Sequence, residues 1–132
     1  MKNLLYLFVA VVFASCTLLD TGIIIDPPNI PTVNICENVA TDGDVTVMKE
    51  KIDAQSFKDE KMDRAKFVTK DYCFVSKQVV DLMDSFAFAD DQLAIAKRLY
   101  EQTTDKNNYD IVADALAYKS DREELMEYIS EH

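Results

Sequence analysis

Glycine is scarce in this chain of 132 residues, which has only two glycines and no tryptophan. A sheet protein with tight turns needs more glycine, because glycine supplies the backbone conformations with positive φ that such turns require. The single histidine, His132, is the last residue, where a chain end is expected to fray. The composition therefore favours an all-α fold and argues against a Cys/His nucleophilic pair.

Positively charged residues are also scarce. The chain has 14 Lys and Arg against 24 Asp and Glu, a formal net charge of -10. A nucleic-acid partner or a polybasic membrane patch would need many cations, so we expect neither. The chain also lacks a glycine-rich phosphate loop, a serine nucleophile elbow and a zinc-type cysteine spacing. We therefore expect no catalytic residues, no metal and no cofactor.

The N-terminus carries the longest apolar run of the chain. One lysine precedes the apolar residues 4–13, and two small residues come directly before Cys16. This layout predicts a signal peptide over residues 1–15, too short to span a membrane. The junction Phe13-Ala14-Ser15-Cys16 resembles a bacterial lipobox, which implies that Cys16 is lipidated and anchors the chain to a membrane. The alternative is an ordinary secretory signal with a chance cysteine.

Residues 16–43 are predicted to form an extended tether, because Pro27, Pro28 and Pro31 bar a helix. The apolar triplet Ile23-Ile24-Ile25 offers a second interpretation, a segment that packs on the domain or on a partner. A helical domain is expected to follow over residues 44–132.

Apolar residues recur at helical spacing from Asp44 onward. Six short helices are expected: about 44–54, 59–69, one capped by Ser76, 90–102, one opening near Asp105, and one opening at Ser120. The clearest amphipathic stripe belongs to the third helix and consists of Val75, Val79, Leu82, Met83 and Phe86.

A short phrase recurs three times in this domain, at intervals of about 30 residues. The copies are Ile52-Asp-Ala-Gln-Ser-Phe57, Met83-Asp-Ser-Phe-Ala-Phe88 and Ala113-Asp-Ala-Leu-Ala-Tyr118. Two positions after each aromatic comes a candidate helix cap, Asp59, Asp90 or Ser120. The pattern predicts three stacked αα-hairpin repeats, with Phe57, Phe88 and Tyr118 plugging the corners. A compact bundle and a short right-handed array both fit it.

Several pieces of this region resemble a known family. They are residues 56–66, 73–79, 86–97, 108–112 and 118–125. In their order and spacing, the run from Ile52 to Ile129 is similar to domain of unknown function 4476, known mainly from lipoproteins and secreted proteins of Bacteroidota-type bacteria. The resemblance implies a fold and an extracytoplasmic location, and it implies no activity.

The remaining candidate residues each allow a chemical and a structural interpretation. Cys36 and Cys73 could form a disulfide in an oxidising compartment, or Cys73 could be a buried apolar thiol. The repeated Asp53, Asp84 and Asp114 could suggest a metal, but a solvated helix face is the preferred interpretation. The acidic last helix, with Glu123, Glu124, Glu127 and Glu131, is likewise expected to be a solvated face rather than a general acid–base pair.

These features together predict a lipid-anchored extracytoplasmic module that binds an envelope protein or peptide. The alternatives are a structural envelope lipoprotein without a specific ligand and a small Cys73-dependent enzyme. Asp20 is the only acidic residue near Cys16. We therefore expect the periplasmic face of the outer membrane rather than the cell surface.

Overall fold

The structure is a computed structural model, and it describes residues 36–132. These residues form α1 (Asp42–Asp53), α2 (Lys58–Thr69), α3 (Ser76–Met83), α4 (Ala89–Tyr100), the 3-10 helix η1 (Lys106–Asn108), α5 (Asp110–Ala115) and α6 (Lys119–Glu131). The same residues form no strand, only two isolated bridges. The all-α prediction is therefore confirmed. The predicted signal peptide, Cys16 and the tether as far as residue 35 lie outside the described residues.

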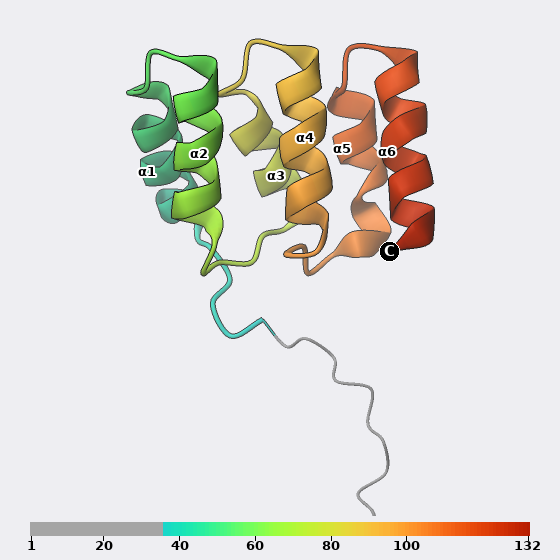
Figure 1. The fold of residues 1–132 in the computed structure, drawn as a ribbon. Coiled ribbons are helices and arrows are strands. Elements are labelled where there is room, and N and C mark those ends of the chain that lie inside the picture. Colours follow the sequence, from blue (N-terminus) through green and yellow to red (C-terminus); the bar gives the residue numbers. More distant parts are fainter. Residues whose placement is uncertain (1–35) are drawn as a thin grey trace, which may run out of the picture. The chain divides into compact units, whose positions relative to one another are not determined.

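Consecutive helices pair into hairpins. Figure 1 shows α1 with α2, α3 with α4, and α5 with α6, and the three corners lie at the same end. Helices α2, α4 and α6 form one layer, and α1, α3 and α5 form the other. Contacts between hairpins join α1 to α3, α3 to α5, and α4 to α6. The chain enters this unit at the end opposite the corners.

The core lies between the two layers. In each copy of the repeated phrase the first residue is buried: Ile52, Met83 and Ala113. The predicted stripe of α3 is also buried, at Val79, Leu82 and Met83, and α4 contributes Ile95 and Leu99. Each large aliphatic side chain removed from water in this way contributes roughly 1.5–3 kcal/mol to folding. The hairpins therefore share one continuous apolar core.

The helices of the second layer begin earlier than predicted. Phe57, Phe88 and Tyr118 themselves occupy the N-cap positions, in extended backbone and without a side-chain capping bond. The prediction that Asp59, Asp90 and Ser120 are the caps is therefore wrong. Asp59 and Asp90 lie in the first turn of their helices, where a carboxylate is favoured by the helix dipole.

Helix α3 is capped from a distant part of the chain. Val75, not Ser76, is the N-cap residue. The backbone N–H and hydroxyl of Ser76 donate to Oδ1 of Asp105, at 2.6 and 2.9 Å. Asp105 was expected to open the fifth helix. It precedes η1 instead, and α5 begins only at Asp110.

The N-terminal segment is fastened to the loop between α2 and α3. Cys36 and Cys73 form a disulfide, with their Cα atoms 6.0 Å apart. Beside it the Ala40 N–H donates to the Cys73 carbonyl at 2.8 Å, and the Cys73 N–H donates to the Asn38 carbonyl at 2.9 Å. Of the two states that the sequence left open for these cysteines, the structure has the paired one.

Candidate interaction surface

The three repeated aromatics lie on the outside of the molecule. The exposed fractions of Phe57, Phe88 and Tyr118 are 69%, 57% and 62%. The prediction that they plug the hairpin corners is therefore wrong. In the second and third hairpins the residue two positions earlier fills the corner instead: Phe86 is 3% exposed and Leu116 is 1% exposed.

We call Phe57, Phe88 and Tyr118 the aromatic edge. All three follow directly after a hairpin corner, and the corners lie at one end of the unit (Figure 1). Isolated exposed apolar residues are common on proteins and need no explanation. An exposed aromatic that recurs at the same place in each hairpin does need an explanation, because packing of the core does not account for it. The aromatic edge is therefore a candidate interaction surface.

A lysine lies on the aromatic edge between the first and second hairpins. The Lys58 ammonium is 5.3 Å from the centroid of the Phe88 ring. It is also 2.6 Å from Oδ2 of Asp90 and 3.3 Å from Oδ1 of Asp91. The hydrogen bond to Asp90 raises the pKa of Lys58, and the same bond lowers the pKa of Asp90. A ring and two carboxylates thus form a cradle for one ammonium group.

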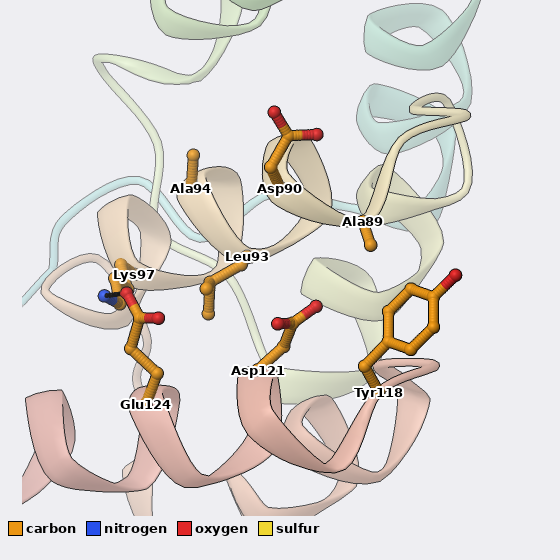
Figure 2. A pocket seen from close by; sticks show the side chains of 8 residues that line it. All are labelled: Ala89, Asp90, Leu93, Ala94, Lys97, Tyr118, Asp121 and Glu124. Carbon is orange, nitrogen blue, oxygen red and sulfur yellow. Dashed lines mark hydrogen bonds and ion pairs between the residues drawn. The ribbon is translucent and has the colours of Figure 1, made fainter.

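The junction between the second and third hairpins is open instead. A groove of about 540 Å³ lies between α4 and α6. Its lining consists of Ala89, Asp90, Leu93, Ala94, Lys97, Tyr118, Asp121 and Glu124 (Figure 2). At one end of the groove Lys97 is paired with Glu124 at 2.6 Å.

The carboxylates of the groove differ in their surroundings. Figure 2 shows Asp121 pointing from α6 towards α4, with Tyr118 beside it, whereas Asp90 points away from α6. Asp90 and Glu124 are each paired with a lysine. Among the described residues, Asp121 has no lysine or arginine within ion-pair distance, and it accepts one bond, from the Ser120 hydroxyl at 3.2 Å. Asp121 is therefore the carboxylate available to a ligand.

The other acidic candidates do not converge. Asp53 lies 3.5 Å from Lys61, and Asp84 lies 3.9 Å from Lys49, so these two repeated aspartates face different cations. Within residues 36–132, no three His, Cys, Asp or Glu side chains are grouped closely enough to hold a metal ion. On the last helix, Glu123 pairs with Lys119, whereas Glu124 belongs to the groove.

Sequence reasoning missed the groove, although a signal for it is present. Aligning the copies of the repeat by their aromatics places Ala89 of the second copy where the first has Lys58. The same alignment places Asp121 where the second copy has Asp91. Compared with the first junction, the second has therefore lost the lysine and one carboxylate, because Ser120 stands where the second copy has Asp90, and it has kept the ring and the other carboxylate. This difference can be read from the sequence once the aromatic is known to be exposed.

The comparisons with known proteins concern the domain as a whole. A family model described as "Domain of unknown function (DUF4476)" matches residues 39–129. No curated protein and no solved structure matches the chain. Nowhere in residues 36–132 is a helix both long enough and apolar enough to cross a membrane.

Proposed function

The chain belongs to the family described as domain of unknown function (DUF4476), and we propose that it is a lipid-anchored interaction module of the bacterial cell envelope. In this proposal Cys16 carries the lipid, the following residues act as a tether, and the helical hairpins bind an envelope protein or peptide. The aromatic edge is the contact surface.

The exposure of Phe57, Phe88 and Tyr118 carries this proposal. An aromatic ring buries a large area on binding and loses little conformational freedom, which is why aromatics are enriched at the centres of interfaces. The three rings are spread over three hairpins, so they suit an elongated partner segment better than a small molecule. An extended or helical peptide is the form of partner that lies along such an edge.

The position of the edge supports the same function. The described unit begins at Cys36, at the end opposite the corners (Figure 1). Cys36 follows Cys16 by 20 positions, and an extended chain of that length reaches roughly 70 Å at most. In our proposal the anchor at Cys16 holds the module on the periplasmic face of the outer membrane, and the aromatic edge lies at the end of the unit away from Cys36.

Crosslinking in living cells tests the proposal. A photoreactive amino acid replaces Phe88 in the full-length chain, and mass spectrometry identifies the captured proteins. Phe67 is the matched control, because it is also an exposed phenylalanine, at 61%, and lies at the far end of α2 from the corner. We expect one dominant partner at position 88 and none at position 67. The triple substitution Phe57→Ala, Phe88→Ala and Tyr118→Ala, with the probe moved to Ala87, should abolish the capture.

Two results would contradict the proposal. Capture of the same scattered, abundant envelope proteins from positions 88 and 67 would favour a structural lipoprotein without a specific ligand. Full capture by the triple alanine variant would show that the partner binds elsewhere on the unit.

A further inference from the structure

We infer that the groove between α4 and α6 binds a lysine side chain of the partner, an inference that rests on the proposed function and names the chemistry of its ligand. The argument begins at the neighbouring junction, where the molecule already contains such a complex. There Lys58 lies over Phe88 and beside the carboxylates of Asp90 and Asp91. A cation over an aromatic face and next to a carboxylate is doubly stabilised.

The second junction repeats part of this cradle without its cation. Tyr118 stands in the position of Phe88 and Asp121 in the position of Asp91, whereas Ser120, which carries no charge, stands in the position of Asp90. The residue that corresponds to Lys58 is Ala89, whose methyl group fills little of the space that a lysine side chain takes up. The groove of about 540 Å³ is found at this place, and Ala89, Tyr118 and Asp121 all line it. A lysine from another molecule can therefore take the role that Lys58 plays in the first junction.

The rest of the lining also suits a lysine. Leu93 and Ala94 provide an apolar surface for the four methylene groups of the side chain. Of the three carboxylates that line the groove, only Asp121 has no lysine or arginine partner among the described residues, and its charge attracts a cation. Because Lys97 and Lys58 already neutralise Glu124 and Asp90, the ligand ammonium is directed to Asp121. Tyr118 also belongs to the aromatic edge, so the groove continues the proposed contact surface.

A pair of short peptides tests the inference on the full chain in neutral detergent micelles. The probe is acetyl-Ala-Ala-Lys-Ala-Ala-amide, and its control carries norleucine, which has a similar apolar stem and no charge. Binding is followed by amide chemical shifts in nuclear magnetic resonance spectra. We expect the lysine peptide to shift the amides of Leu93, Ala94 and Asp121 saturably, with a Kd of about 1–10 mM, since one exposed ion pair and one cation–π contact are weak.

Two substitutions define the site. Asp121→Asn should weaken the lysine peptide about twofold to fivefold, because it removes the charge and keeps the shape. Ala89→Lys should abolish binding, because it places a lysine as Lys58 is placed and so occupies the groove. Ala54→Lys is the matched control: it adds the same charge at an exposed position near the first corner, and it should leave binding unchanged. Raising the salt from low to high concentration should weaken binding of the lysine peptide.

The inference is overturned if the norleucine peptide gives the same shifts, if no saturable shifts occur, or if Ala89→Lys and Ala54→Lys behave alike. The proposed function has a separate test. If Ala89→Lys and Asp121→Asn still capture the dominant partner through position 88 at full yield, the aromatic edge binds that partner and the lysine inference is wrong. If position 88 captures no dominant partner while the lysine peptide binds as expected, the proposed function fails and the groove stands as a lysine site.

Discussion

Phe86 and Phe88 are two residues apart at the same hairpin corner and have opposite surroundings. Phe86 is 3% exposed and packs in the core, whereas Phe88 is 57% exposed. Truncation of a buried phenylalanine costs about 3–5 kcal/mol through lost burial and the cavity left behind. Phe86→Ala should therefore lower the free energy of unfolding by about that amount, and Phe88→Ala by less than about 1 kcal/mol. Urea denaturation of the two variants measures both values.

Leu116 and Tyr118 provide the matched pair at the third corner, because Leu116 is 1% exposed and Tyr118 is 62% exposed. Leu116→Ala should cost about 2–5 kcal/mol, and Tyr118→Ala again less than about 1 kcal/mol. A larger loss from Phe88→Ala than from Phe86→Ala would refute the assignment of core and edge.

Helical periodicity predicted the buried face of α3 correctly, because Val79, Leu82 and Met83 recur at the spacing of one helix face. Periodicity ends where the helix ends. Beyond Met83 the direction of each side chain depends on the backbone of the corner, which turns from a helical Asp84 to an extended Phe88. The sequence alone predicted Phe86 on the apolar stripe, and Phe86 is buried. It lies beyond the end of α3, however, and the sequence could not show that Phe86 rather than Phe88 fills the corner.

At the scale of the helices, Asp105 stabilises the start of α3 across 29 residues of sequence. Burial raises the pKa of Asp105, but the hydrogen bonds from the Ser76 N–H and hydroxyl, together with those from the Asn108 side chain and the backbone N–H of Asp105, outweigh burial and hold that pKa below its usual value. Capping by a residue so far away could not be predicted from local sequence, because local rules search only the adjoining residues for a cap. The local rules therefore predict Ser76 as the cap.

Asp105→Asn should lower the free energy of unfolding by about 1–2 kcal/mol at neutral pH, because the amide replaces a charged acceptor.

The lowered pKa of Asp105 also makes the free energy of unfolding depend on pH. The ionised carboxylate stabilises the folded state fully above the ordinary aspartate pKa of about 3.9, and this contribution is lost as the pH falls through the lower folded-state pKa. Urea denaturation between neutral and acidic pH should therefore show a smaller acid loss in Asp105→Asn than in the wild type.

Asp114→Asn is the control for this substitution. Asp114 is an exposed aspartate on α5. Its replacement should leave the stability within about 0.5 kcal/mol of the wild type at neutral pH. Equal stability of the two variants, or an unchanged acid loss in Asp105→Asn, would show that Asp105 does not cap α3.

The disulfide joins two elements that lie far apart in the chain. Cys36 and Cys73 are separated by 37 residues, and closing a loop of that size in the unfolded chain stabilises the fold by roughly 3–4 kcal/mol in the entropy model. The double variant Cys36→Ser with Cys73→Ser should therefore unfold at a clearly lower temperature. Dithiothreitol should lower the Tm of the wild type by a similar amount and leave the Tm of the double variant unchanged. A reductant effect of equal size on both proteins would rule out this bond as the cause.

At the scale of the whole molecule, anchoring and folding should be separable. The described residues 36–132 have their own continuous core, and Cys16 lies outside them. Cys16→Ser should therefore shift the protein from the detergent phase to the aqueous phase in a phase-partition assay, because the acyl chains are the proposed anchor. Its urea unfolding midpoint should match that of the wild type, since no core residue changes. Thr17→Ser is the control, because it alters the next residue and leaves the Cys16 sulfur in place. If Cys16→Ser still partitions into detergent like the wild type, the lipid is not attached at this cysteine. If it leaves the detergent phase and also loses stability, the N-terminal segment contributes to folding as well as to anchoring.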